Sequence, residues 1–304
     1  MNYMYDIIVI GNISVDLYFK GKSLTKDNGR FQLAIGGKYF SDEFYEDIGG
    51  GGCNVAAGLA KKDYKVAVFG KIGNNAFKNI ILKKLEDKNI SSEFCQFQDD
   101  YYKISSILLT ESGERTIINY ETPANLWKEF ILSEQIKTAK NVYIGPLPHI
   151  ALEEKNKIVS YFKGPEVLTI INLADNDCRR SIEQLKIIFD GLDVLIVNSH
   201  EFSDLIKKDY SQINFKNNLL ELLPNLQEKT LIVTDAEKGS YGYFKNEVYY
   251  QQAIVPERIV DTTGAGDGYT AGFIAAYLKT KDIKKSMETG ADYASEILAK
   301  IGAN

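Results

Sequence analysis

Short apolar runs alternate with longer amphipathic stretches along most of this 304-residue chain. The runs are apolar at nearly every position, which is typical of parallel strands covered on both faces. They occupy residues 6–10, 65–69, 142–144, 167–171, 194–197 and 231–233. Helical spacing predicts helices over residues 74–88, 150–162, 181–189 and 215–223. This alternation predicts an α/β fold with a doubly wound, mostly parallel sheet.

Two stretches, residues 12–48 and 97–122, contain strand-like runs without helices. In the first, Gly36-Gly37 separates residues 31–35 from 38–40, which is a signal for a two-residue hairpin. In the second, residues 103–110 and 115–120 flank a turn near residues 111–114. We predict that both stretches pair into a small β-sheet that covers a site as a lid, within one domain spanning residues 1–304. An extended edge of the main sheet is the alternative.

The composition excludes several classes of protein. A net charge of −5 gives no general affinity for nucleic acid or anionic membrane. No apolar run approaches the ~20 residues that cross a bilayer, and the N-terminus lacks the basic region of a signal peptide. Cys53, Cys95 and Cys178 are widely spaced, and with only two histidines they form neither a zinc pattern nor a disulfide framework. We therefore expect a reduced, cytoplasmic protein.

The strongest chemical signal is Asp261-Thr-Thr-Gly-Ala-Gly-Asp267, which directly precedes a helix predicted over residues 268–278. Backbone N–H groups at the start of a helix attract anions, and the small residues Gly264, Ala265 and Gly266 allow a ligand to come close. Asp267 could instead be the helix N-cap, although a cap alone does not need this many glycines. Donors for an anion beside a carboxylate base are what phosphoryl transfer requires.

Three further groups of residues can be interpreted either as ligand-binding features or as ordinary structural features. Four glycines and Cys53 precede Asn54, where a helix is predicted to start; close ligand approach explains their entropic cost better than a flexible turn. Asp16 follows the first strand and, with an amide such as Asn54, suits vicinal hydroxyl groups; an exposed turn carboxylate is the alternative. Asn198 and Glu201 follow the strand 194–197, at the edge where open α/β sheets bind ligands. A helix cap at Asn198 is the alternative.

Together these motifs resemble the ribokinase-like (PfkB) family of carbohydrate and nucleoside kinases. The resemblance rests on residues 261–267, on residues 49–58 with 66–73, and on Asn198-Ser-His-Glu201, and it extends over nearly all the chain. It implies an ATP-dependent phosphotransferase that uses Mg²⁺ and phosphorylates a hydroxyl of a small sugar of the ribose, fructose or ketodeoxygluconate type. An adenosine-type nucleoside kinase and a non-catalytic sugar-binding member of the fold are the alternatives.

The resemblance also assigns roles to individual residues. It implies that Asp267 is the general base and that the amides of Gly264, Ala265 and Gly266 form an anion hole. The residues implied in acceptor binding are Asp16, Gly50, Gly51 and Asn54. The residues implied in binding ATP and Mg²⁺ are Asn198, Glu201, Thr234, Gly239 and Asp292, with Glu201 acting on Mg²⁺ through water.

Two other positions bear on the nucleotide side of this comparison. Asp261 and Thr263 match positions that hold a monovalent cation such as K⁺ in some members of the family. Ala236 stands where the family usually has glycine, and it would be strained if that position needs a positive φ.

Other nucleotide-binding motifs are incomplete. The Gly-x-Gly-x-x-Gly pattern of dehydrogenases does not occur at either glycine-rich segment, and a P-loop ending at Gly21-Lys22-Ser23 would need glycine where Asp16 stands.

The acceptor depends on residues of the predicted lid. A phosphorylated acceptor would require that Arg30, Lys38 and Arg115 converge. A nucleoside would require stacking on aromatic side chains, for which the candidates are Tyr18, Phe40, Tyr101 and Tyr102. We expect a neutral sugar, and a homodimer formed through the lid.

Overall fold

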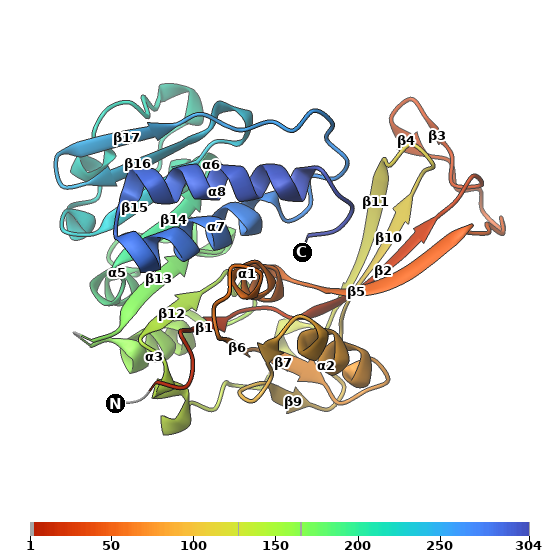
Figure 1. The fold of residues 1–304 in the computed structure, drawn as a ribbon, viewed down its shortest axis with the longest axis horizontal. Helices are drawn as coiled ribbons and strands as arrows, with labels where there is room; N and C mark the ends of the chain where they lie inside the picture. The colour runs from red at the N-terminus through yellow and green to blue at the C-terminus, as the bar shows by residue number, and fades with distance from the viewer. Residues whose placement is uncertain (1–2, 127, 165, 304) are drawn as a thin grey trace.

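A nine-stranded sheet crosses the main body of the molecule (Figure 1), within the residues 3–126, 128–164 and 166–303 that the computed structural model describes. In order across the sheet, the strands are β17 (Glu247–Gln251), β16 (Ser240–Phe244), β15 (Thr230–Thr234), β14 (Val194–Asn198), β13 (Leu168–Asn172), β12 (Asn141–Ile144), β1 (Ile7–Ile10), β6 (Val66–Phe69) and β8 (Ile90–Ser91). The ladders that join β15 to β16 and β16 to β17 are antiparallel, and the others are parallel. The predicted doubly wound, mostly parallel sheet is confirmed.

Helices cover both faces of this sheet, which explains why its strands are continuously apolar. Along β1, Ile7 and Val9 face one hydrophobic core, while Ile8 and Ile10 face the other. The first core includes residues of α1 (Gly51–Ala60), α2 (Lys78–Asp87), α7 (Ala265–Thr280) and α8 (Ile283–Leu298). The second includes residues of α3 (Leu152–Phe162), α4 (Asp175–Cys178), α5 (Lys186–Gly191) and α6 (Ser199–Ile206).

The helix predicted over residues 150–162 is confirmed as α3, but two others begin late. Helix α2 begins at Lys78 because the amide oxygen of Asn75 accepts a hydrogen bond from Phe77 N at 2.9 Å and holds a turn there. Helix α5 begins at Lys186 because Ser181 and Gln184 exchange side chain–backbone hydrogen bonds of 3.1 and 3.3 Å.

The helix predicted over residues 215–223 is wrong. Only a 3₁₀ turn, Leu219–Leu222, forms there. The side chain of Asn218 accepts a hydrogen bond from Leu220 N at 3.1 Å, and Pro224 restricts the backbone of Leu223, so the helical pattern is interrupted at both ends.

A separate four-stranded sheet projects from the main body (Figure 1). Its strands, in order, are β11 (Arg115–Glu121), β10 (Lys103–Leu109), β2 (Ser14–Lys20) and β5 (Glu43–Gly49). Because β2 pairs in parallel with β10, the two predicted insertions meet in one sheet. The prediction of a small sheet is confirmed, and the alternative, an extended edge of the main sheet, is wrong.

The hairpin predicted at Gly36-Gly37 is also wrong. The hairpin of this segment instead joins β3 (Lys26–Asp27) to β4 (Arg30–Phe31). Its turn residues, Asn28 (φ 48°) and Gly29 (φ 73°), both have positive φ, as the favoured two-residue hairpin turn requires. Asn-Gly is the stronger signal because asparagine tolerates this conformation well.

No helix in the described part of the chain is both long and apolar enough to cross a bilayer.

Candidate active site

Asp267 lies in the first turn of α7, which begins at Ala265 rather than at the predicted Gly268. The N-cap is Gly264, which has a left-handed backbone (φ 76°) and no side chain to accept a hydrogen bond. The first N–H groups of the helix therefore have no acceptor within it and face outward with the positive end of its dipole. Asp267 is thus not the N-cap, so the capping alternative is wrong.

The carboxylate of Asp267 is held by Asn54 of α1. Its Oδ2 accepts a hydrogen bond of 2.8 Å from Asn54 Nδ2, and the side chain stays partly exposed. Burial raises the pKa of Asp267 to about 6, and the hydrogen bond from Asn54 opposes this rise. A carboxylate with this pKa is ionised at neutral pH and is still basic enough to accept a proton from a hydroxyl.

The glycine run leads into α1, which begins at Gly51 and not near Asn54. A Cβ at Gly49 would lie 2.1 Å from Asp16 Oδ2, and a Cβ at Gly51 would lie 3.4 Å from Asp267 Oδ1. The structure therefore explains glycine at Gly49 by the approach of a protein carboxylate, whereas we had predicted the approach of a ligand. Because consecutive Cα atoms are 3.8 Å apart, Gly49 and Gly51 are at most about 7.6 Å apart, so Asp16 and Asp267 flank the same short segment.

Asp16 lies on β2 and is 6% exposed, so the alternative of an exposed turn carboxylate is wrong. Its Oδ1 accepts a hydrogen bond of 3.0 Å from Ser14 Oγ. Burial raises the pKa of Asp16, while hydrogen bonds from Ser105 and Ser14 lower it. A buried carboxylate held in this way can accept hydrogen bonds from the hydroxyls of a small polar ligand.

A pocket of about 430 Å³ adjoins the start of α7. Of the predicted nucleotide-binding residues, Asn198, Thr234 and Gly239 line it, together with Ala265 and Gly266 of the predicted anion hole. The other lining residues include Gln251, which ends β17, then Gln252, Ala253, Ile254, Val255 and Ile259 from the segment that follows, and Ala291, Ala294 and Leu298 of α8. A mostly apolar pocket beside helix N–H groups suits an apolar base linked to an anion.

The sequence did not indicate the segment 251–259, because it contains no recognisable motif. Val255 is 60% exposed and Ile259 is 52% exposed, and such apolar side chains around an open pocket are typical of a binding site. Asp292 is exposed and is not among the residues that line the pocket, whereas its neighbour Ala291 is. Its assignment to ATP therefore gains no support from the structure.

Ala236, which lines the same pocket, has a φ of 47°. This positive φ is the condition under which we expected alanine to be strained at this position. A left-handed conformation costs a residue with a Cβ roughly 1–2 kcal/mol, which glycine would not incur.

Asn198 and Glu201 form a capping box at the start of α6, so the capping alternative is correct for Asn198. The side-chain oxygen of Asn198 accepts hydrogen bonds from the N–H groups of residues 200 and 201, and Glu201 Oε2 accepts one of 2.8 Å from Asn198 N. Burial raises the pKa of Glu201 to about 7, and the neighbouring carboxylate of Asp175 adds to this rise.

Asp175 begins α4, just beyond the end of β13, and nothing in the sequence singled it out. Within the described ranges, no three histidine, cysteine, aspartate or glutamate side chains are grouped to hold a metal. Two carboxylates such as those of Asp175 and Glu201 nevertheless suit Mg²⁺, which keeps most of its water ligands and binds few protein groups.

The predicted monovalent-cation site, by contrast, is filled by the protein. Asp261 is 3% exposed and forms an ion pair with Arg115. Its oxygens also accept hydrogen bonds from Thr263 N at 2.8 Å and from Gly302 N at 3.2 Å. The residues present therefore do not fit a K⁺ ion at Asp261.

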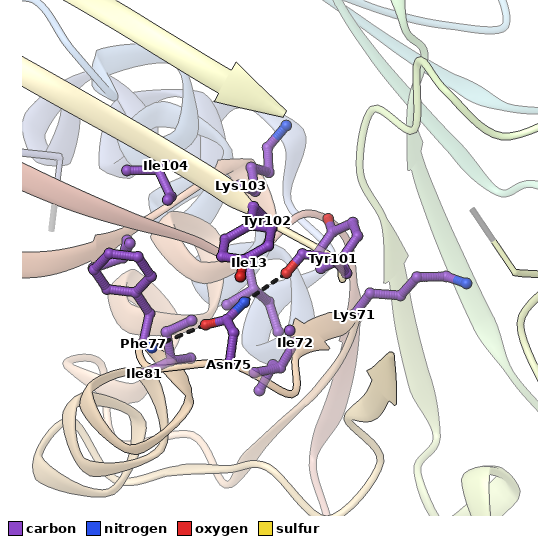
Figure 2. A pocket seen from close by; sticks show the side chains of 12 residues that line it. Ile13, Lys71, Ile72, Asn75, Phe77, Ile81, Tyr101, Tyr102, Lys103 and Ile104 are labelled. Atoms are coloured by element: carbon purple, nitrogen blue, oxygen red, sulfur yellow. Dashed lines mark hydrogen bonds between the residues drawn. The ribbon is translucent and has the colours of Figure 1, made fainter. Parts of the chain in front are cut away.

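A much smaller pocket lies where the four-stranded sheet joins the main body (Figure 2). Asn75 spans it, donating to the carbonyl oxygen of Tyr101 at 2.6 Å and accepting from Phe77 N at 2.9 Å. Its volume of about 10 Å³ is at the lower limit for one water molecule. This junction is therefore packed protein and not a second ligand site.

Comparisons with known proteins agree with this fold. A family model described as pfkB family carbohydrate kinase matches residues 4–304. The chain is 26% identical over 309 residues to a ribokinase of Arabidopsis thaliana, covering 98% of this chain and 77% of that protein. It is 27% identical over 310 residues to a nucleoside kinase of Methanocaldococcus jannaschii, covering 98% and 92%. The structure of Arabidopsis thaliana ribokinase complexed with ribose and ATP has a TM-score of 0.76 and 22% identity, covering 98% of this chain and 94% of that one.

Proposed function

Because the chain belongs to the pfkB family of carbohydrate kinases, we propose that it transfers the terminal phosphate of ATP to a hydroxyl of a small neutral sugar. The observation that carries this proposal is the position of Asp267, whose carboxylate is bonded to Asn54 in the first turn of α7. The 430 Å³ pocket adjoins this turn through Ala265 and Gly266, and the segment Gly49–Gly51 brings Asp16 near Asp267.

In this proposal Asp267 removes the proton of the acceptor hydroxyl as the oxygen attacks phosphorus. The amides of Gly264, Ala265 and Gly266 stabilise the negative charge on the transferred phosphoryl group, aided by the dipole of the sixteen-residue helix α7. Asp16 and Asn54, with the backbone at Gly50 and Gly51, hold the acceptor so that one hydroxyl lies against Asp267.

The nucleotide occupies the 430 Å³ pocket, with Thr234 and Gly239 near the phosphates and the apolar residues of α8 near the base. Glu201, acting through water, and Asp175 would hold Mg²⁺, which would offset the charge of the phosphates. This binding requires Glu201 to be ionised.

A phosphorylated acceptor is disfavoured because the cations of the small sheet nearest the site are already paired. Lys103 Nζ lies 2.6 Å from Glu121, and Arg115 is paired with Asp261. Arg30 and Lys38 are exposed in the segment between β3 and β5. A second anionic group would therefore find little uncompensated positive charge.

A nucleoside acceptor is the alternative, which the similarity to the Methanocaldococcus jannaschii enzyme keeps open. Most candidate stacking residues are unsuitable. Tyr18 is 2% exposed and already stacks on Tyr45, with ring centroids 4.5 Å apart. Tyr101 is also 2% exposed and Phe40 is 79% exposed, which leaves Tyr102 as the partly exposed candidate.

The small sheet, formed by residues 12–48 and 97–122, acts in this proposal as a lid over the acceptor. Hydrogen exchange in both segments should slow when the acceptor binds, and unchanged exchange would remove this role. The outer face of the sheet would form the homodimer contact, because Phe44, Ile118 and Tyr120 are 55%, 58% and 56% exposed there. Replacing Phe44 and Ile118 by serine should then give a monomer in size-exclusion chromatography with light scattering.

The kinase proposal is tested with purified protein, Mg-ATP and a panel of neutral sugars and nucleosides. ATP should be consumed with at least one sugar, whereas turnover with nucleosides alone would establish the alternative. Asp267→Asn should lower kcat by ~10²–10⁴-fold, and a loss below about threefold would exclude Asp267 as the base. Asp190→Asn, which changes a surface carboxylate paired with Lys186, is the matched control and should have no effect.

A further inference from the structure

Arg115 is the first residue of β11 in the small sheet, and its charged side chain contacts the segment that leads into α7. Its Nη1 forms an ion pair with Asp261 Oδ1, and its Nη2 donates a hydrogen bond of 3.0 Å to Thr262 Oγ1. The Asp261 side chain is 3% exposed and that of Arg115 is 23% exposed. A guanidinium in this position is permanently charged and is oriented by two contacts.

Both carboxylate oxygens of Asp261 already have partners within the protein. Oδ1 accepts from Thr263 N in addition to its ion pair with Arg115, and Oδ2 accepts from Gly302 N. A buried carboxylate must be compensated, and here the protein supplies all of the compensation. A monovalent cation would have to displace Arg115 or approach the same carboxylate against its positive charge.

We propose that Arg115 takes the place of a monovalent cation at Asp261, so that phosphotransfer by this protein is independent of K⁺. The proposal rests on the proposed kinase function. Arg115 acts as a positioning residue, because its guanidinium binds Asp261 and Thr262 and it is not among the residues that line the nucleotide pocket. By fixing Asp261 and Thr262, it fixes the segment whose next residues, Gly264 to Gly266, present the anion-binding amides.

This arrangement also couples the small sheet to the anion hole. Two further features bring the same parts together. Gly113, in the β10–β11 turn, lies so near Val260 that a Cβ at this position would be 3.8 Å from Val260 O, and Ile301 packs against a cluster of Tyr18, Ile107 and Leu109. Because Arg115 belongs to the sheet, moving the sheet away would remove the ion pair of the buried Asp261 carboxylate and leave it with backbone hydrogen bonds alone. We therefore expect the amides to be correctly placed only while the sheet is in position.

The kinetic test compares KCl with choline chloride at equal ionic strength. The wild type should have the same kcat in both salts. Arg115→Ala should lower kcat by about tenfold or more, which is less than the ~10²–10³-fold that loss of a direct anion-hole donor causes. The variant should be faster in KCl than in choline chloride, and millimolar guanidinium should restore part of its activity. Arg115→Lys, which keeps the charge, should retain more activity than Arg115→Ala.

Arg30→Ala is the matched control, since it removes an exposed arginine from β4, in the separate two-stranded hairpin between β2 and β5. It should change neither kcat nor the response to K⁺. A wild-type rate that rises severalfold in KCl would overturn the proposal. So would an Arg115→Ala variant that keeps the wild-type rate in both salts.

A second readout needs no kinase activity. Thermal unfolding of the ligand-free protein should give the same Tm in KCl and in choline chloride for the wild type, and a higher Tm in KCl for Arg115→Ala. A wild type stabilised by K⁺ would overturn the proposal even if no acceptor is found. If no sugar or nucleoside is phosphorylated, the kinase function fails separately. If Arg115→Ala does not fold, the wild type and Arg115→Lys, each compared in KCl and in choline chloride, still test whether the protein is independent of K⁺.

Discussion

The hydrogen bond from Asn54 to Asp267 makes a quantitative prediction about pH dependence. Asn54→Ala removes a donor that stabilises the ionised carboxylate, so the pKa of Asp267 should rise above its value of about 6. A hydrogen bond to a charged group contributes about 1.5–3 kcal/mol. Because Asp267 is partly exposed, water can replace part of the lost hydrogen bond, so we use the lower value of about 1.5 kcal/mol. About 1.4 kcal/mol corresponds to a change of one in pKa, so the variant should titrate near pH 7.

The effect should be greatest on the acid side of the profile. Moving the pKa from about 6 to about 7 lowers the ionised fraction at pH 6 from about 50% to about 10%, and at pH 8 only from about 99% to about 91%. The assay is kcat/KM for the acceptor at saturating Mg-ATP, since this quantity reports the pKa values of the acceptor-free enzyme. Beyond any constant loss of affinity, the activity relative to wild type should fall about fivefold further between pH 8 and pH 6.

Ser14→Ala is the control, because it removes a hydrogen bond of 3.0 Å from the other buried carboxylate, Asp16. It should lower kcat/KM by the same factor at every pH and leave the midpoint near 6. If Asn54→Ala also keeps its midpoint near 6 while losing activity, Asn54 acts only in binding. The assignment of the acid limb to Asp267 would then be refuted.

Three further changes have defined outcomes. Gly49→Ala places a Cβ 2.1 Å from Asp16 Oδ2, so the acceptor KM should rise about tenfold or more; an unchanged KM would exclude Asp16 from acceptor binding. The apparent affinity for Mg²⁺ should weaken as the pH falls through about 7, because Glu201 becomes protonated, and Glu201→Gln should bind Mg²⁺ weakly at every pH. Ala236→Gly removes a strain of roughly 1–2 kcal/mol and adds about 0.5–1 kcal/mol of glycine entropy, so the Tm should rise by about 1–3 °C in calorimetry; a fall would contradict this reasoning.

The sequence predicts those features that depend on local pattern. The six predicted parallel strands form because a strand buried on both faces must be apolar at each position, and the run 261–267 predicts the turn at α7 through its own glycines. The predicted helix over residues 215–223 failed because side-chain hydrogen bonds and Pro224 compete with helical spacing, although both signals are visible in the sequence. Asn28-Gly29 was likewise visible as a hairpin signal.

Contacts between distant segments could not be predicted in this way. Arg115 and Thr262 are 147 residues apart, and no periodicity connects them. Asp175 and the segment 251–259 lie beside functional residues only because their strands end at the same edge of the sheet. Such positions carry no motif of their own, since what fixes them is the packing of the complete fold.

The interior position of β1 in the main sheet has a consequence for biosynthesis. This strand is made before both of its neighbours in the sheet, β6 and β12, which begin at residues 66 and 141. At translation rates of about 5–20 residues per second, about 7–26 s pass between the synthesis of Ile10 and the start of β12. Asn54 and Asp267 are 213 residues apart, so the carboxylate reaches its partner about 11–43 s after Asn54 is made. Nascent chains of this protein should therefore expose apolar strands for much of synthesis, and we expect its yield to depend on chaperones more than its final stability would indicate.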